Sequence, residues 1–277
     1  MEQLNEALCV CDAKAIITSI EKLYPHTKVA KRRGGAFKIK ESMKNQYFGD
    51  INDYKKYGLL RSIASASKIK ILVAWMLTED DGSTDGKFIE YLSEEKKWSK
   101  YDEPLYIEIS DLLKKNEKRE VGLIEKTNIL GSSDYFSKIV PDNSELRANW
   151  LTELINKSEN NDLIFLDPDN GLEVKSKKFG TKNSSKFLYW SEVQKLWDEG
   201  KSLLIYQHFI REKRDTFIER MLKTLSEKTP TSKVEAFSTS NVVFLLALQP
   251  THHQFHQPIA SLVESRWKDQ MWSFNNR

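Results

Sequence analysis

Residues 162–173 have the sequence DLIFLDPDNGLE, and this stretch decides how the rest of the chain is interpreted. Its four apolar residues, 163–166, are followed at once by the turn sequence DPDNG. A short, uninterrupted apolar run bounded by turn residues is typical of a strand that is covered on both faces, as in a parallel sheet. Pro168 fixes its own φ and the Asn-Gly pair tolerates positive φ, so the carboxylates lie on a rigid bend at the strand end.

Other apolar runs along the chain show the same continuous pattern and are also predicted to be strands: Ile69–Leu77, Leu105–Ile109, Leu203–Tyr206 and Val242–Leu248. Helical patterns separate them, with plausible capping boxes that start at Asp142 and at Ser191. This alternation predicts an α/β fold with a doubly wound, mostly parallel sheet of the Rossmann-like type. We expect an N-terminal helix and basic arm over residues 1–45, and one α/β domain over 46–277.

Composition excludes several classes of protein. Of the 277 residues, 39% are hydrophobic and 30% are charged, which argues against fibrous and disordered chains. The apolar runs are far shorter than the roughly 20 residues that cross a bilayer, and the first residues lack a basic signal region, so we expect a cytoplasmic protein without a membrane partner. Cys9 and Cys11 are too close together for an ordinary disulfide and too few for a zinc site.

Positive charge is concentrated in two segments, although the net charge is only +3. Residues 28–44 carry seven basic residues and one acid, and they include Lys31, Arg32 and Arg33. Residues 175–186 carry five lysines and no acid, and they include Lys175, Lys177 and Lys178. Solvated surface loops are the alternative interpretation of both segments.

The bend after the central strand is the strongest candidate for chemistry. Open parallel sheets bind ligands beyond the carboxyl ends of their strands, where Asp167, Asp169 and Asn170 are expected to lie. The lysines that follow suit phosphate oxygens, whereas the acids suit an amine, a hydroxyl group or a metal. The alternative is an ordinary Asx turn capped by Asp169.

Two further strand ends carry polar residues. The first strand is followed by residues 78–87, TEDDGSTDGK, which match neither a Walker A motif nor GxGxxG. Asp80 or Asp81 could hold the ribose hydroxyls of an adenosine cofactor, or belong to a solvated turn. His208 ends another predicted strand and is a candidate general base or donor, or a simple sheet cap. Three more histidines, His252, His253 and His256, lack ligand partners nearby in sequence and are expected at a solvated helix start, so metal is left out of the leading interpretation.

The segment Tyr47–Leu60, YFGDINDYKKYGLL, is predicted to be a helix with polar residues in its first turns. If it packs antiparallel to the first strand, these polar residues face the edge where the strands end. The alternative is purely structural: Asp50 caps the helix and Asp53 completes a capping box.

These residues resemble a known family. The run from Tyr47 to Tyr57 is similar to His-Ala-Gly-Asn-Phe-Ala-Asp-Val-x-Lys-His of large-subunit ribosomal-RNA adenine methyltransferases, and it matches at Gly49, Asp53 and Lys56. Asp167-Pro168 resembles the first half of their Asp-Pro-Pro-Tyr motif, and the pair also resembles the methyltransferase-like partners of three-cysteine-motif proteins. The resemblance implies an S-adenosylmethionine site. Asp169-Asn170 stand in place of Pro-Tyr, which would supply the platform for a flipped base.

Three functions are compatible with this sequence. The favoured one is an S-adenosylmethionine-dependent methyltransferase that acts on nucleic acid, DNA or RNA. The expected catalytic residues are Asp167, Asp169, Asn170 and His208; those at the cofactor are Tyr47, Gly49, Asp53, Lys56, Asp80 and Asp81; those at the nucleic acid are Lys31, Arg32, Arg33, Lys175, Lys177 and Lys178.

The second is a nuclease that holds Mg²⁺ or Mn²⁺ on Asp167, Asp169 and Glu173, although three residues between Asp169 and Glu173 leave no room for the hairpin of a PD-ExK site. The third is a non-catalytic, methyltransferase-like domain that binds nucleic acid. A protein partner for the N-terminal appendage is a further possibility in all three cases.

Overall fold

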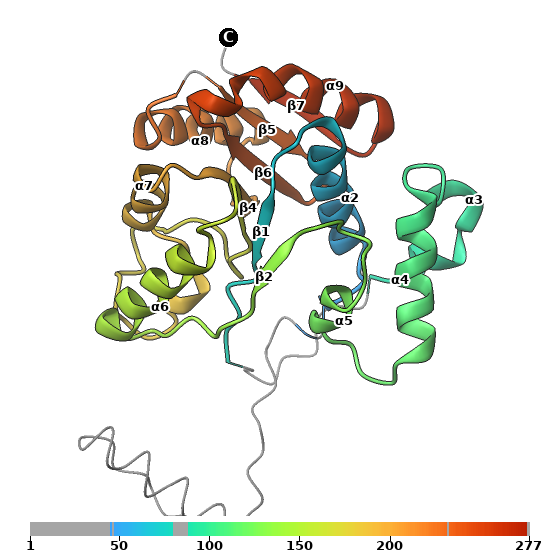
Figure 1. The fold of residues 1–277 in the computed structure, drawn as a ribbon, viewed down its shortest axis with the longest axis horizontal. Coiled ribbons are helices and arrows are strands. Elements are labelled where there is room, and N and C mark those ends of the chain that lie inside the picture. The colour runs from blue at the N-terminus through green and yellow to red at the C-terminus, as the bar shows by residue number, and fades with distance from the viewer. Residues whose placement is uncertain (1–44, 46, 80–87, 232, 276–277) are drawn as a thin grey trace, which may run out of the picture. The chain divides into compact units, whose positions relative to one another are not determined.

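The computed structural model describes residues 45, 47–79, 88–231 and 233–275 (Figure 1). These residues form a mixed α/β fold around one sheet. Its strands are β1 (Ile71–Ala74), β2 (Asp134–Phe136), β3 (Leu163–Leu166), β4 (Ser202–His208), β5 (Val234–Ser238), β6 (Val242–Ala247) and β7 (Trp272–Asn275). The α-helices are α2 (Ile51–Ala66), α3 (Glu95–Trp98), α4 (Glu103–Lys115), α5 (Gly122–Glu125), α6 (Ser144–Lys157), α7 (Trp190–Asp198), α8 (Arg214–Lys228) and α9 (His256–Arg266). The 3₁₀ helices are η2 (Glu90–Ser93), η3 (Ser184–Lys186) and η4 (Pro250–Phe255).

The sheet has a parallel half and an antiparallel half. Its strand order is β2-β1-β3-β4-β6-β5-β7, in which β2, β1, β3 and β4 are mutually parallel. Strand β6 runs antiparallel to both β4 and β5, and β5 runs antiparallel to β7. The prediction of a mostly parallel sheet is therefore correct only for the first half, because a run buried on both faces does not reveal its direction.

Helices cover both faces of this sheet (Figure 1). One apolar core lies between the sheet and α2, α4, α5 and α9, and the other lies between the sheet and α6, α7 and α8. Helix α2 approaches α9 so closely that a Cβ on Gly58 would lie 1.7 Å from Trp267. Only glycine fits at this contact, so α2 and the end of α9 pack closely against each other.

The predicted strand Leu105–Ile109 is wrong, because these residues belong to helix α4. Asp102 caps this helix by accepting a hydrogen bond from the Leu105 backbone NH, and Pro104 lies in the first turn, where it needs no donor. Leu105, Tyr106 and Ile109 are buried and fall on one helical face. The N-cap and the helical spacing of the buried residues together favour a helix, although the apolar run alone suggests a strand.

The strand order reverses between β1 and β3. From β1 the chain goes to β2 on one side, and from β2 it returns through α6 to β3 on the other side of β1. Open α/β sheets bind ligands beyond the carboxyl ends of their strands at such a reversal. The candidate residues after β3 stand at this place.

The predicted N-terminal helix and basic arm, 1–45, lie outside the described residues apart from Asn45, so the boundary at 45 stays a prediction. Among the helices that the structure describes, none combines the length and apolar character needed to span a bilayer.

Candidate functional site

The first turn of α2 is held by its own carboxylates. Asp50 is the N-cap and accepts hydrogen bonds from the backbone NH groups of Asn52 (2.8 Å) and Asp53 (2.9 Å). Asp53 Oδ2 accepts from the Gly49 backbone NH (3.0 Å) and from the Tyr57 hydroxyl (3.2 Å). The predicted cap at Asp50 is confirmed, whereas Asp53 bonds the residue before the cap rather than the cap itself.

Lys56 joins this helix to the end of β3. Its Nζ lies 2.8 Å from Asp53 Oδ1 and 3.0 Å from Asp167 Oδ2. Helical spacing places Asp53 and Lys56 on one face, three residues apart. The contact with Asp167 shows that the polar end of α2 does face the edge where the parallel strands end, as expected from an antiparallel packing of α2 and β1.

Aromatic rings from the two neighbouring strands complete the surroundings of Lys56. Its Nζ lies 4.9 Å from the ring centroid of Tyr206, in β4, and 6.0 Å from that of Trp75, directly after β1. The sheet register explains this, since Ala74, Leu166 and Ile205 are aligned across the three strands and the next residue of each strand meets Lys56. We call Asp53, Lys56 and Asp167 the Lys56 cluster.

The Lys56 cluster is buried and carries one cation for two carboxylates. The exposed fractions are 4% for Asp53, 7% for Lys56 and 2% for Asp167. Burial alone would lower the pKa of the Lys56 ammonium, but the charges of Asp167 and Asp53 outweigh it and hold that pKa well above its ordinary value. Burial and the nearby charge of Asp53 raise the pKa of Asp50 to about 6. Two buried carboxylates thus share the Lys56 ammonium, and the charges of Asp50 and Asp53 also act on the half-buried Arg119 guanidinium.

Gln207, in β4, holds the bend after β3 in place. Its Oε1 accepts from the Leu172 backbone NH (2.6 Å), and its Nε2 donates to the His208 carbonyl (2.6 Å). Gly171 has φ +84°, and a Cβ at this position would lie 2.5 Å from Gln207 Oε1. The bend is rigid, as the sequence predicts, and the reason includes a close contact with β4 as well as the turn residues.

Asp169 links the ends of β3 and β1. Its Oδ2 accepts a hydrogen bond from the hydroxyl of Thr78, which lies four residues after the end of β1. Asp169 is half-buried and Asn170 is exposed, in contrast to the buried Asp167. A molecule that approaches this edge from solvent would therefore meet Asp169 and Asn170 before Asp167.

His208 lies at the carboxyl end of β4 and is half-buried. Its ring stands edge-on to Tyr206, with 5.0 Å between centroids, and Tyr206 in turn contacts Lys56. The structure thus brings together Gly49, Asp53, Lys56, Asp167 and, through Tyr206, His208. Tyr47 is half-buried two residues before Gly49.

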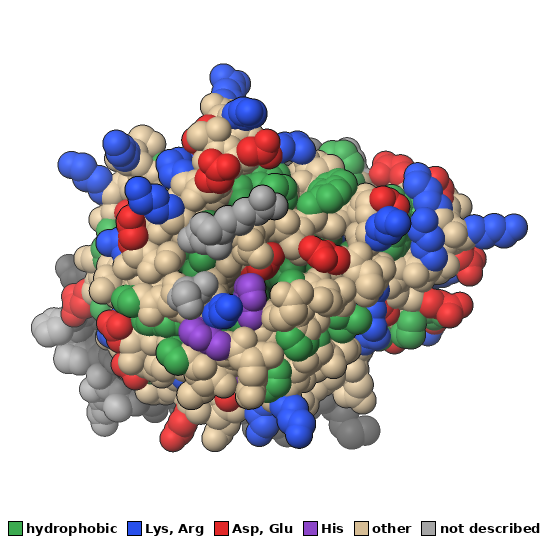
Figure 2. All heavy atoms as spheres, turned by 90° about the horizontal axis from the view of Figure 1, so that it is seen from above, with side chains coloured by type: hydrophobic (Ala, Val, Ile, Leu, Met, Phe, Trp, Pro, Cys, Tyr) green, Lys and Arg blue, Asp and Glu red, His purple; other side chains and the backbone are tan. Residues whose placement is uncertain are grey.

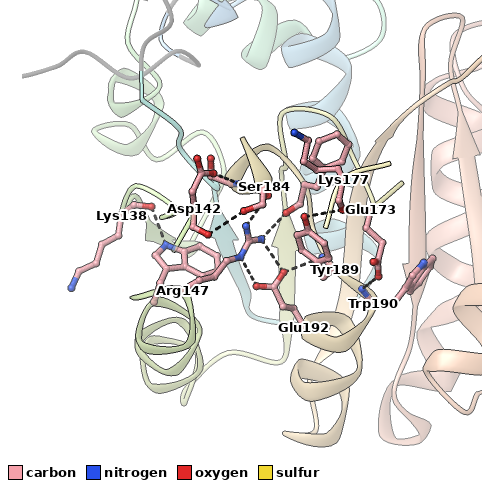
Figure 3. Close-up of polar contacts among 12 residues, drawn as sticks. Lys138, Asp142, Arg147, Glu173, Lys177, Ser184, Tyr189, Trp190 and Glu192 are labelled. Carbon is pink, nitrogen blue, oxygen red and sulfur yellow. Dashed lines mark hydrogen bonds and ion pairs between the residues drawn. The ribbon is translucent and has the colours of Figure 1, made fainter. Parts of the chain in front are cut away.

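The predicted nucleic-acid loop is tied down by a buried ion pair (Figure 3). Arg147 in α6 bonds Glu192 in α7 twice, with Nε–Oε1 2.7 Å and Nη2–Oε2 2.9 Å. The same guanidinium donates to the carbonyls of Ser184 (2.9 Å) and Phe187 (2.6 Å), which end the loop. Arg147 thereby holds the loop against the face of the sheet that α6, α7 and α8 cover.

Asp142 secures the same loop rather than starting α6. Its carboxylate accepts from the backbone NH groups of Asn183 (2.7 Å) and Ser185 (2.8 Å). Asn143 caps α6 instead, so the predicted capping box at Asp142 is wrong. The predicted cap at Ser191 is also wrong, because α7 begins at Trp190 and its N-cap is Tyr189. Charge-assisted bonds to a distant loop compete successfully with a local cap at Asp142.

The loop still presents basic groups to solvent. Lys175 and Lys178 are exposed, while Lys177 is half-buried and donates from Nζ to the Lys182 carbonyl (2.8 Å). The remaining predicted site residues lie outside the described residues: Lys31, Arg32, Arg33, Asp80 and Asp81. Their roles stay predictions.

The three carboxylates of the nuclease hypothesis have separate partners. Asp167 contacts Lys56, Asp169 contacts Thr78, and Glu173 Oε1 accepts from the Trp190 backbone NH at the start of α7 (2.8 Å; Figure 3). In the part of the chain that the structure describes, no group of three or more His, Cys, Asp or Glu residues is arranged to hold a metal ion. No observation favours the nuclease hypothesis.

The histidines of residues 252–256 lie at a helix start, as predicted, in η4 and at the first residue of α9, but they are half-buried rather than solvated. His252 Nδ1 lies 2.8 Å from Ser202 Oγ, and His256 Nε2 lies 2.9 Å from Glu235 Oε2. Figure 2 looks down on the molecule from above the view of Figure 1 and shows histidine side chains close together in the middle of that face. They are at the opposite edge of the sheet from the Lys56 cluster, since Ser202 begins β4 and His208 ends it.

Three residues of the site escaped prediction: Thr78, Tyr206 and Gln207. Thr78 follows the first apolar run at once, and Tyr206 and Gln207 directly precede His208. Their positions at strand ends were a usable signal, because the residues that follow parallel strands meet at one edge.

Comparison with protein-family models and with curated proteins finds no match. Among solved structures, the chain is similar to protein LPL1258 from Legionella pneumophila str. Philadelphia 1, of the family model DUF519. The TM-score is 0.39 at 9% sequence identity, and the alignment covers 83% of this chain and 96% of that one. A similarity this low identifies no function.

Proposed function

We propose that this chain is an S-adenosylmethionine-dependent methyltransferase that acts on nucleic acid. The observation that carries the proposal is the convergence of the Lys56 cluster, Asp169 and Thr78 at the carboxyl ends of β1 and β3, where the strand order reverses. Ligands of open α/β sheets bind at this point. The matched positions of the family resemblance, Gly49, Asp53 and Lys56, all belong to this convergence.

The strand order also supports the proposal. The parallel strands β1, β3 and β4 lie side by side, so the residues that follow them meet at one edge. The bend that carries Asp167-Pro168 follows β3, next to β1, and therefore lies at the same edge as the end of α2 that carries Asp53 and Lys56.

The charge of the site fits the cofactor. S-adenosylmethionine supplies a methyl group from a positively charged sulfonium and also carries an ammonium and a carboxylate group. The carboxylates of Asp50, Asp53 and Asp167 suit its cationic groups, while Lys56 and the Arg119 guanidinium, whose charge interacts with Asp50 and Asp53, are the cations at this edge. The lysines of residues 175–186 lie outside the Lys56 cluster and suit the phosphates of a substrate.

The residues divide into an exposed set and a buried set. Asp169 and Asn170 are more exposed than Asp167 and would accept hydrogen bonds from the amine or hydroxyl group that is methylated. Asp167 and Lys56 are buried and hold the bend in position. His208, at the end of the adjacent strand β4, is a candidate to take up a proton.

Calorimetry with S-adenosylmethionine tests the cofactor. We expect saturable binding to the full chain, abolished in Lys56→Met and in Asp53→Asn and unchanged in Lys114→Met, a matched lysine on the exposed side of α4. Circular dichroism establishes that each variant is folded. Absence of heat at high protein concentration would contradict the proposal.

Transfer of a radiolabelled methyl group to total RNA or to denatured DNA tests the reaction separately. We expect Asp169→Asn to reduce transfer at least tenfold while it leaves cofactor binding within about threefold. Cofactor binding without any transfer would instead identify a non-catalytic, methyltransferase-like protein.

A further inference from the structure

Two loops that leave neighbouring parallel strands at the same edge of the sheet expose apolar side chains between basic ones. The first follows β3 and comprises residues 174–183; the second follows β4 and comprises residues 209–214. Phe179 is 41% exposed in the first loop and Ile210 is 49% exposed in the second. We call these two loops together the rim.

The rim is strongly positive. Its exposed basic residues are Lys175, Lys178, Lys182, Arg211, Lys213 and Arg214. The acids nearby are Glu212, which pairs with Arg220 (2.5 Å), Glu173 and Asp142, which accept from backbone NH groups, and the exposed Asp215. The six basic side chains outnumber these acids, so the surface favours a polyanion.

The first loop is preorganised to present its aromatic side chain. Phe179 stands edge-on to Tyr189, with 5.0 Å between centroids, and the buried Arg147 guanidinium lies 5.6 Å from the Phe179 ring centroid. Arg147 is in turn held by the Glu192 carboxylate and by the carbonyls of Ser184 and Phe187, which follow the loop. One side of the ring is supported by the protein while the rest of it faces solvent, so stacking on it costs little conformational entropy.

We propose that the rim binds an unpaired nucleic-acid strand, with phosphates on its basic side chains and bases stacked against Phe179 and Ile210. A duplex offers phosphates, but its base faces are already stacked on each other and leave the apolar side chains without a partner. An unpaired strand offers phosphates to the basic side chains and free base faces to the apolar ones. The loop is also continuous with the site, because the Asn170 NH donates to the Lys186 carbonyl (2.8 Å) and the Leu188 NH donates to the Gly171 carbonyl (3.0 Å).

The depth of the site agrees with an unpaired substrate. Asp167 is only 2% exposed and Asp169 is half-buried, so a base within a duplex would have to leave its stack to reach them. A base in a single strand avoids that cost. This inference rests on the proposed function for the nature of the site, but the binding surface itself is tested without the cofactor.

Fluorescence anisotropy with labelled oligonucleotides of about 12 nucleotides tests the proposal, since aromatic single-strand sites span roughly 4–16 nucleotides. The same sequence is used as a single strand and as a blunt duplex. We expect the single strand to bind at least tenfold more tightly. Preference for the duplex, or no binding of either probe at low salt, would overturn the proposal.

Two pairs of variants separate stacking from charge. Phe179→Ala should weaken single-strand binding by about 5- to 100-fold without changing its salt dependence, and Phe179→Tyr should retain it. Ile107→Ala, which removes a side chain that is 50% exposed on α4, is the matched control. Lys178→Gln should lower the slope of log affinity against log salt by about 0.7, whereas Lys114→Gln should not.

The outcomes remain distinguishable from those of the proposed function. If calorimetry detects S-adenosylmethionine binding but Phe179→Ala binds the single strand as the parent does, the rim proposal fails and the methyltransferase proposal stands. If the strand binds as expected but S-adenosylmethionine does not bind, the methyltransferase proposal fails and the rim proposal stands.

Discussion

The molecule contains two buried ionic clusters near the carboxyl edge of its sheet, and they differ in how their charge is balanced. Arg147 meets one carboxylate, Glu192, and its remaining donors are used by two backbone carbonyls. Lys56 meets two carboxylates, Asp53 and Asp167, while Asp50 adds a third nearby.

This difference separates a structural role from a functional one. The Arg147–Glu192 pair is complete in itself, since charge and hydrogen bonds are satisfied inside the chain, and it secures a loop. The Lys56 cluster instead shares one ammonium between two carboxylates at the point where the strand order reverses. Buried ionisable groups with strongly perturbed pKa values are concentrated at functional sites.

The largest effect on stability is expected from Arg147→Met. The substitution leaves the Glu192 carboxylate buried without its cation and the Ser184 and Phe187 carbonyls without their donor, which should cost about 3–5 kcal/mol of the free energy of unfolding. Urea denaturation measures it. Arg220→Met, which breaks the exposed pair with Glu212, is the control and should cost less than about 1 kcal/mol. Equal costs would show that burial does not distinguish these pairs.

The Lys56→Met variant sharpens the comparison, because it removes the cation that the Asp53 and Asp167 carboxylates share. We expect a cost of about 3 kcal/mol at pH 7. If repulsion between the two carboxylates is the main cause, the cost should be smaller at pH 5 than at pH 8. A cost that is the same at pH 5 and pH 8 would mean that this repulsion is not what destabilises the variant.

Gly171→Ala tests the rigidity of the bend that supplies Asp169. The positive φ and the clash of the new Cβ with the Gln207 amide should cost about 2–3 kcal/mol. Thermal denaturation of Gly171→Ala, Gln207→Ala and the double variant measures the coupling. If the clash is the main cause, the double variant is more stable than the sum of the single effects predicts.

The smallest effect concerns Asp50, whose pKa is raised from 3.8 to about 6, first by burial and then by the charge of Asp53. A raised carboxyl pKa means that the folded state binds the proton more tightly, so this group's contribution to stability declines as pH rises from about 4 to about 6. Asp50→Asn keeps the cap but removes the charge, and it should stabilise the protein by about 1–2 kcal/mol at pH 7. The gain should disappear near pH 4 in urea titrations; a gain independent of pH would contradict it.

Local sequence predicts local structure well in this chain. The apolar runs at 69–77, 163–166, 203–206 and 242–248 all contain strands, and Asp50 caps α2 as its spacing indicates. The two failures have different physical origins, one local and one tertiary. Leu105–Ile109 is an apolar run made helical by its cap and face, and Asp142 leaves its expected cap to bond a loop more than 40 residues away.

The sequence by itself determined which residues are buried, where strands end and which turns are rigid, because these properties depend on side chains a few positions apart. Only the tertiary structure decided that Lys56 meets Asp167, 111 residues later in the chain, and that Thr78 meets Asp169. Those contacts follow from strand order and register, which bring the ends of β1, β3 and β4 to one level. No local pattern encodes that order, since a strand buried on both faces looks the same whichever neighbour it pairs with.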